Sequence, residues 1–292
     1  MPELPEVETM VRGIRSAVEG RTIQDFEACP NRCRPLTMRP SLASQRERVV
    51  GQRIAEVRRR AKRIVLLLSD ESAFVIEPRM TGLLLLADPP DREHLRLVWH
   101  LSASGSETDL WFWDRRGLGT VSLYSRREWE RHLGPERLGP DALEMTRAQW
   151  QLVCQSTTRP IKVALLDQIR VAGIGNLYAS EILHVCGIDP RHRACSLTQR
   201  EIGRLGDAVR HVLEEAIRYE GSTLSDGTYR NAPNRAGGYQ NQHRVYDRAG
   251  LPCPRCGFAI RRIVQAQRAT FFCPGCQKRS RWKQFRELPP HS

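Results

Sequence analysis

The sequence predicts an α+β protein of several domains: an N-terminal helix, a β-rich segment, a helical segment and a small metal-binding finger. Three observations predict this order. Short apolar runs separated by turn residues fill residues 52–125, helical patterns with capping boxes follow residue 146, and two Cys-x-x-Cys pairs lie near the C-terminus. A chain of 292 residues has room for about two domains with their own cores.

The first element is a helix predicted over residues 5–19. Apolar residues recur at helical spacing from Val7 to Val18, Pro5 suits a first helical turn, and Gly20 suits the end of a helix.

The next segment is rich in predicted strands. Its apolar runs are Ile64–Leu68, Phe74–Ile76, Leu83–Leu86, Leu97–Leu101, Leu110–Trp113 and Val121–Tyr124. Several short strands in a row are typical of a β-sandwich or a barrel.

The composition changes at Gly134–Asp141, which holds two Gly-Pro pairs and is interpreted as a linker. Capping-box pairs then predict two helix starts, at Thr146 with Gln149 and at Thr198 with Glu201. An apolar stripe between residues 202 and 217 predicts an amphipathic core helix. Residues 221–250 lack periodicity, and we interpret them as a long loop, which is usually functional or mobile.

Four cysteines have the spacing of a zinc ribbon. Cys253 and Cys256 are separated from Cys273 and Cys276 by sixteen residues, and two such knuckles complete a tetrahedral, structural four-thiolate site. Two disulfides are the alternative, which a cytoplasmic chain disfavours. The residues between the knuckles predict a β-hairpin with a cationic tip, suited to nucleic acid. The other five cysteines (29, 33, 154, 186 and 195) lack paired ligand spacing.

The net charge of +13 favours a polyanionic partner, and nucleic acid is the commonest one. Residues 251–292 carry nine cations and one acid, and thus +8 of this excess. A solvated basic tail is the alternative interpretation. No apolar run has the length of a membrane span, and the N-terminus lacks the pattern of a secretory signal, so we expect a cytoplasmic protein without membrane contact.

The N-terminus carries residues suited to covalent catalysis. Removal of Met1 would expose the secondary amine of Pro2, which can attack a sugar carbon and form an iminium ion directly. Glu3 and Glu6 lie within one turn and could transfer protons. The alternative is structural: a helix-entry proline and a carboxylate favoured by the helix dipole.

Three motifs occur together in this order: Pro2-Glu3-Leu4-Pro5-Glu6, the segment from Gly173 to Glu181, and Gln267-Arg268-Ala269-Thr270 in the finger. In combination they resemble the bacterial formamidopyrimidine-DNA glycosylase family over roughly residues 2–278. The resemblance implies an N-terminal β-sandwich, a helix–two-turns–helix domain and a zinc finger. The implied boundaries are 1–134 for the catalytic sandwich domain, 146–222 for the helical DNA-binding domain, 223–250 for a lesion-capping loop and connector, 251–278 for the finger and 279–292 for a basic tail.

The resemblance also implies the catalytic residues. Pro2 would be the nucleophile at C1′, Glu3 the acid/base, and Glu6 a residue that holds water or helps to position the damaged base. Lys62, which opens a strand after three arginines, would contact phosphate and assist the chemistry, and Arg268 completes the implied set.

Implied DNA contacts come from several segments. Asn176 and Arg268 would grip the phosphates that flank the lesion, with the glycine-rich helix start at 173–175 lending backbone donors. Lys162 matches a lysine linked to damage recognition, and His94 matches a further DNA contact. Met80 matches an intercalating methionine that fills the space of the extruded base.

One motif departs from the family pattern Asp-x-Arg-x-Phe-Gly. Here it runs from Asp114 to Gly119, with Arg116 facing the orphaned cytosine and Leu118 where the family usually has Phe. Leucine is apolar but cannot stack as an aromatic ring does.

The resemblance therefore implies a monomeric, bifunctional enzyme of the bacterial cytoplasm and nucleoid. It would remove 8-oxoguanine and formamidopyrimidines from duplex DNA, cut abasic sites by β,δ-elimination, and carry one structural zinc and no redox cofactor. Two alternatives stay open: an endonuclease VIII-type enzyme for oxidised pyrimidines, which Leu4 disfavours because Gly is usual there, and a non-catalytic binder of damaged DNA.

Overall fold

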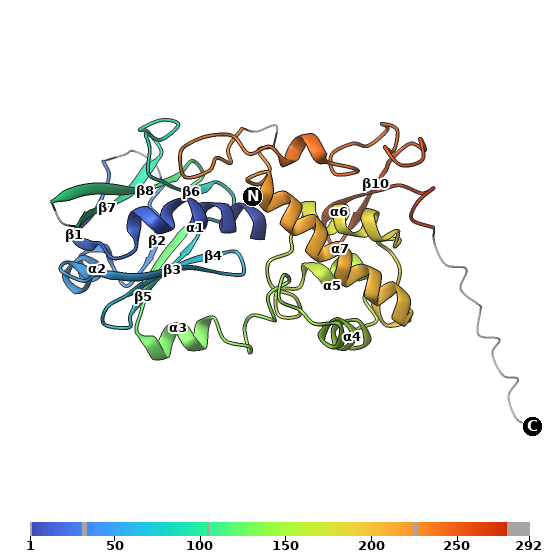
Figure 1. Cartoon of the computed structure of the whole chain (residues 1–292), viewed down its shortest axis with the longest axis horizontal. Coiled ribbons are helices and arrows are strands. Elements are labelled where there is room, and N and C mark those ends of the chain that lie inside the picture. Colours follow the sequence, from blue (N-terminus) through green and yellow to red (C-terminus); the bar gives the residue numbers. More distant parts are fainter. Residues whose placement is uncertain (1, 31–33, 104, 225–226, 279–292) are drawn as a thin grey trace, which may run out of the picture.

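The chain folds into two lobes in this computed structural model, which describes residues 2–30, 34–103, 105–224 and 227–278 (Figure 1). The N-terminal lobe is a β-sandwich with helices, and the C-terminal lobe is helical and carries a two-stranded finger. The predicted α+β class and the three-part architecture are confirmed. Met1, Cys33 and the basic tail from 279 lie outside the described residues.

The N-terminal lobe contains the helices α1 (Leu4–Val18), α2 (Leu42–Val49) and α3 (Arg126–His132). Its strands are β1 (Thr22–Ala28), β2 (Thr37–Arg39), β3 (Ile54–Arg60), β4 (Arg63–Leu68), β5 (Ala73–Glu77), β6 (Gly82–Leu85), β7 (Leu95–Ala103), β8 (Ser106–Asp114) and β9 (Thr120–Tyr124). They form one sheet in the order β1-β7-β8-β6 and a second in the order β2-β9-β5-β4-β3.

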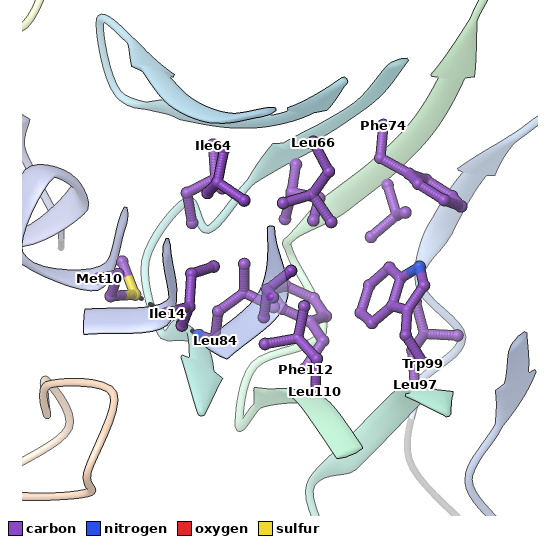
Figure 2. Close-up of a cluster of buried hydrophobic side chains, with 14 of the residues drawn as sticks. Met10, Ile14, Ile64, Leu66, Phe74, Leu84, Leu97, Trp99, Leu110 and Phe112 are labelled. Atoms are coloured by element: carbon purple, nitrogen blue, oxygen red, sulfur yellow. Dashed lines mark hydrogen bonds between the residues drawn. The ribbon is translucent and has the colours of Figure 1, made fainter. Parts of the chain in front are cut away.

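The core of the sandwich lies between these sheets and includes the apolar face of α1. Figure 2 shows Ile64, Leu66 and Phe74 of the second sheet facing residues of the first sheet, among them Trp99 and Phe112. Strand alternation explains the choice of residues, because Ile64 and Leu66 point inward while Val65 joins a separate cluster on the outer face.

Three strands were not predicted from the sequence, namely β1, β2 and β3. All three are edge strands of their sheets. β3 illustrates the reason, since only Ile54 and Val57 of its seven residues are buried and three arginines close it. A strand with so few buried positions leaves no apolar run to detect, unlike the edge strand β6, whose four residues are all buried. The helices α2 and α3 were missed as well. They bury two residues and none, respectively.

The C-terminal lobe contains α4 (Arg147–Gln155), α5 (Ile161–Leu166), α6 (Asn176–Cys186) and α7 (Gln199–Arg218), with short 3-10 turns η1 (Ala194–Ser196) and η2 (Tyr239–Gln242). Both predicted capping boxes are present, at the starts of α4 and α7. The predicted stripe on α7 is fully buried in the helical core. The finger follows as the hairpin of β10 (Arg261–Gln265) and β11 (Arg268–Phe272).

The N-terminal helix belongs to both lobes. Leu4 lies in the helical core, whereas Val7 and the later apolar residues of α1 lie in the sandwich core. The long loop also joins the two lobes, because Tyr229 and Ala232 pack in the sandwich core and Tyr239 packs in the helical core. The first residues of the chain are thereby held where the lobes meet. Among the described residues, no helix is long and apolar enough to span a membrane.

A buried cation ties the interlobe linker to the sandwich. Arg59 of β3 donates to Asp141 at 2.5 and 3.1 Å and to Glu8 of α1 at 2.8 Å, and 8% of its side chain is exposed. Burial alone would raise the pKa of Glu8, but hydrogen bonds and charge from Arg12 and Arg59 hold that pKa below its ordinary value.

Replacing Arg59 by Met should lower the free energy of unfolding by about 3 kcal/mol, because the buried carboxylate of Asp141 loses its cation and the partly buried Glu8 keeps only Arg12. Urea unfolding of the whole chain followed by circular dichroism measures this. Arg126→Met serves as the control, since Arg126 is 58% exposed in its ion pairs, and no measurable change is expected. Equal losses in the two variants would contradict the assigned role of Arg59.

Candidate functional site

A cavity of about 240 Å³ lies between the lobes and brings together residues from four distant segments. Pro2 precedes α1, Lys62 lies in the β3–β4 turn, Asn176 begins α6 and Arg268 begins β11. Its remaining lining residues are Arg63, Glu77, Arg79, Leu166, Gln168 and Gly175. Sequence reasoning selected the first four residues. Gln168, which carries no periodic or motif signal, was missed; its side chain bonds Gly173 and Ile174 and supports the glycine-rich turn.

Lys62 reaches the cavity from a tight hairpin. Ala61 has a φ of 56°, in the left-handed region, and β3 and β4 pair on either side of the turn. Burial lowers the pKa of Lys62 from its ordinary value. The charge of Glu3 opposes this decrease, and the charge of Arg268 adds to it. The turn therefore places beside Pro2 an amine that loses its proton more readily than an ordinary lysine does.

Glu3 is bound to the N-terminus of α6. Its carboxylate accepts backbone N–H bonds from Gly175 at 2.7 Å, Leu177 at 3.0 Å and Tyr178 at 3.4 Å. The sequence predicted that this glycine-rich helix start would lend backbone donors to a DNA phosphate. That prediction is wrong for these three donors, because a side chain of the chain itself occupies them. A helix N-terminus favours any anion, and Glu3 supplies one internally.

Two glycines make this contact possible. A Cβ atom on Gly175 would lie 2.2–2.6 Å from the carboxylate atoms of Glu3. Gly173 has a φ of +108°, and a Cβ there would lie 2.4 Å from a side-chain carbon of Leu4. The backbone of this turn therefore approaches the N-terminal segment as closely as only glycine allows.

Glu6 lies beneath the site and does not line the cavity described above. Its carboxylate accepts bonds from the backbone of Glu3 at 2.9 Å, the hydroxyl of Tyr178 at 2.5 Å and the backbone of Ser222 at 2.9 Å. Burial raises the pKa of Glu6, and the nearby charge of Glu3 adds to this while the Tyr178 hydroxyl opposes it. Glu6 thus joins the N-terminus to α6 and to the start of the long loop.

Lys162 is buried and bridges α5 to the finger. Its ammonium donates at 2.8 Å to Asn176 Oδ1, to the carbonyl of Ala269 and to the hydroxyl of Thr270. Burial lowers the pKa of Lys162 to about 7, while the three acceptors suit its protonated form. Because Lys162 holds the oxygen of the Asn176 amide, the NH₂ group of that amide is the end left to face the cavity.

Arg268 is exposed at the start of β11. The two-residue turn before it, Ala266 and Gln267, has φ values of 45° and 60°, as a type I′ hairpin turn requires. The hairpin was predicted correctly, and its placement brings an arginine from the far end of the chain to Pro2.

Two loops beside the cavity carry the predicted wedge residues. Met80 lies in the turn between β5 and β6 and shares a small pocket with Pro2, and Arg116 and Leu118 lie in the β8–β9 turn. Asp114 joins the two loops: its carboxylate accepts bonds from the Thr81 hydroxyl, the Arg116 backbone at 3.2 Å and the Gly119 backbone at 2.7 Å. The positioning role of Asp114 was missed, and its place between a strand and a glycine turn is the only signal for it.

His94 lies near this region without lining the cavity. Its Nδ1 is 2.8 Å from Asp91 Oδ1, and its ring packs edge-on against Trp113.

The long loop after α7 closes on itself at its base. Thr223 bonds Tyr229 and Gly237 through its hydroxyl and Gln240 through its backbone, at 2.7 to 2.9 Å. Ser225 and Asp226 lie outside the described residues.

The four ribbon cysteines converge. Their sulfur atoms all lie within 4.8 Å of one another, with three pairs at 3.4 to 3.8 Å. Zinc–sulfur bonds of about 2.3 Å place tetrahedral sulfurs roughly 3.8 Å apart, so the cluster fits one structural zinc ion with no open position. Cys29, Cys154, Cys186 and Cys195 take no part in it.

Comparison with known families covers most of the chain. Three family models match. Residues 1–121 match the model described as "Formamidopyrimidine-DNA glycosylase N-terminal domain", and residues 133–228 match "Formamidopyrimidine-DNA glycosylase H2TH domain". Residues 250–279 match "Zinc finger found in FPG and IleRS".

Individual proteins are similar over nearly their whole length. Formamidopyrimidine-DNA glycosylase of Gluconobacter oxydans is 41% identical, covering 95% of this chain and 100% of that protein. The crystal structure of the MutM (Fpg) protein of Thermus thermophilus matches with a TM-score of 0.81 at 38% identity, covering 94% of this chain and 98% of that one. Lactococcus lactis Fpg in complex with abasic-site DNA matches with a TM-score of 0.84 at 30% identity, covering 95% and 100%.

Gly175→Ala should lower the free energy of unfolding by about 2 kcal/mol, because the new methyl group displaces the Glu3 carboxylate or the turn that holds it. Thermal or urea unfolding measures the loss. Gly203→Ala on α7 is the matched control: its Cβ would lie 3.5 Å from the end of the Arg147 side chain, so unchanged or slightly higher stability is expected. The close contact would be refuted by a Gly175→Ala protein as stable as the parent.

Proposed function

This chain belongs to the formamidopyrimidine-DNA glycosylase family, and on that premise we propose that it excises oxidised purines from duplex DNA and cuts the resulting abasic site. The observation that carries the proposal is the cavity between the lobes. Pro2, Lys62, Asn176 and Arg268 meet there, from four segments spread over the chain. An enzyme that acts on a base holds the extruded nucleotide in such a pocket, and a nucleophile beside three groups suited to phosphate supports this use.

The proposed reaction starts with the amine of Pro2, after removal of Met1. The nitrogen attacks C1′ of the extruded nucleotide, the bond from C1′ to the base breaks, and the base leaves with a proton. The sugar ring opens, and the nitrogen lone pair forms an iminium ion with C1′. The proton that the Pro2 nitrogen loses on attack goes to the departing base. Glu3 lies next to Pro2, and within the described residues its Oε1 accepts one backbone bond, from Leu177. Its remaining lone pair can take the other proton of the Pro2 ammonium group before the attack and deliver it to the ring oxygen as the ring opens.

The iminium ion then drives strand cleavage. Loss of a proton from C2′ expels the 3′ phosphate, and a second elimination expels the 5′ phosphate, leaving a one-nucleotide gap. Lys62 is proposed to assist these proton transfers, which its place in the same cavity as Pro2 and its lowered pKa, caused by burial, support. Water then releases the sugar fragment from the nitrogen.

Binding of the damaged strand is assigned to the cationic side of the cavity. Arg268 and the NH₂ group of Asn176 are proposed to hold the phosphates next to the lesion. Lys162 fixes the positions of Asn176 and Arg268, since its ammonium donates to the Asn176 amide and to the β11 backbone next to Arg268. We therefore propose Lys162 as a positioning residue, and His94 as a more distant contact.

The two loops joined by Asp114 are proposed to fill the space left by the extruded nucleotide. Met80 and Leu118 would wedge between base pairs while Arg116, which is exposed, faces the unpaired cytosine. The loop over residues 223–250 is proposed to cover the extruded base. We also propose that the protein acts as a monomer on the DNA of the bacterial cytoplasm, with one structural zinc ion.

A panel of duplexes tests the substrate class. Duplexes with 8-oxoguanine or formamidopyrimidine opposite cytosine should be cut, and a thymine glycol duplex should be cut far more slowly, as measured by gel analysis of product strands. Cleavage of thymine glycol alone would instead favour an enzyme for oxidised pyrimidines. Binding without any cleavage would favour a damage-binding protein.

Lys62→Ala should lower kcat/KM for 8-oxoguanine excision by about 100-fold, the size expected when a proton-transferring group is lost. Single-turnover cleavage kinetics give the rate. Lys278→Ala provides the control, because Lys278 is exposed at the end of the finger and does not line the cavity. An equal decrease of kcat/KM in the two variants would contradict a proton-transfer role for Lys62 and indicate that it contributes only positive charge.

A further inference from the structure

The C-terminal end of α6 packs directly on both knuckles of the finger. Arg255, between Cys253 and Cys256, donates to the carbonyls of His184 at 3.4 Å and Val185 at 3.2 Å. Gln277, next to Cys276, donates to the carbonyl of Ile188 at 2.9 Å. The last carbonyls of a helix have no partner within it. Here the finger supplies donors to this end of α6, so the metal site and the helix are built against each other.

One side chain of α6 reaches the metal-binding sulfurs themselves. His184 is 1% exposed, and its Nε2 lies 3.3 Å from the Sγ of Cys253, which is 3% exposed. Within the described residues, His184 Nδ1 has no hydrogen-bond partner. Among the described residues, the one contact that uses a ring nitrogen is therefore the one to sulfur. A metal-bound thiolate can only accept a hydrogen bond, so beside a thiolate this contact places the proton of a neutral ring on Nε2.

We propose that His184 extends the zinc site beyond the finger, by donating its Nε2–H to the Cys253 thiolate. A zinc ion with four thiolates carries a net charge of −2, and a buried thiolate has little water to offset that charge. A hydrogen bond from the ring offsets part of it. It also lowers the tendency of the sulfur to take up a proton and leave the metal.

The proposal gives the helical lobe a part in holding the metal. α6 begins at Asn176, beside the reaction cavity, and reaches the metal through His184 two turns later. At its start, the helix is linked through the Lys162 ammonium to Thr270 of β11, and near its end it meets Cys253. Loss of zinc should therefore disturb the packing of the finger against α6 as well as the finger itself.

The test compares zinc retention in the full-length, zinc-loaded protein and in three variants. His184→Phe keeps a ring of similar size but cannot donate, His184→Gln keeps an N–H donor, and His211→Phe alters an exposed histidine of α7 as the matched control. The readout is the rate of zinc transfer to an excess of a coloured chelator. We expect His184→Phe to release zinc about 10-fold faster, and both other variants to stay near the parent rate.

A second readout separates hydrogen bonding from packing. In protein loaded with Co²⁺, the sulfur-to-metal charge-transfer band should shift in His184→Phe and return toward the parent position in His184→Gln. Parent-like release and an unshifted band in His184→Phe would overturn the proposal. Equal release from the Phe and Gln variants would also overturn it, because the ring would then act by packing alone.

If His184→Phe does not fold, a parent-like band and release rate in His184→Gln support the donor role, and loss of both overturns it. None of these measurements involves DNA, so they stand apart from the proposed enzymatic activity.

Discussion

The contact between the Glu3 carboxylate and the first turn of α6 is the interaction on which the site depends. Three backbone N–H groups of the helical lobe hold the side chain that precedes α1, the helix shared by the two lobes. Pro2 precedes Glu3 directly, so this contact sets where the start of the chain lies. The terminal residues of most proteins are poorly ordered unless something ties them down. Here a helix terminus does so, with Gly175 providing the necessary closeness.

The same contact has a consequence for how the protein meets DNA. Helix N-termini commonly bind phosphate, but the donors at 175, 177 and 178 are already used. The proposed recognition of the strand beside the lesion therefore relies on side chains, chiefly those of Lys62, Asn176 and Arg268. This arrangement separates two tasks. Backbone groups of the α6 N-terminus position the start of the chain, and side chains of the β3–β4 turn, the start of α6 and the start of β11 are proposed to hold the substrate.

The sequence predicted those features that rest on local patterns. The buried stripe of α7, both capping boxes and the four-cysteine cluster follow from spacing alone, because each is decided within about twenty residues. The edge strands β1, β2 and β3 were missed because most of their residues are not buried, whereas the edge strand β6 is fully buried and was predicted from its apolar run. Family resemblance selected Pro2, Lys62 and Arg268, which the fold then places in one cavity.

Other parts of the site could not be predicted from patterns, since they depend on contacts between distant segments. The lysine at 162 matched a DNA contact, yet its three bonds go to α6 and β11, more than a hundred residues away in the second case. Asp114 and Gln168 act by holding turns, a role for which Gln168 carries no local signal and Asp114 only its place between a strand and a glycine turn. Glu6 was expected to hold water or to help position the damaged base, which stays a prediction, and its bonds to Tyr178 and Ser222 beneath the N-terminus have no local sequence signal.

The proposed mechanism is tested most directly by reducing the protein with borohydride while it acts on 8-oxoguanine DNA, and then mapping the linked peptide by mass spectrometry. The mechanism predicts a covalent adduct on the nitrogen of Pro2, in a chain from which Met1 has been removed. An adduct on Lys62 or on any other side chain, or an active protein that keeps Met1, would contradict it.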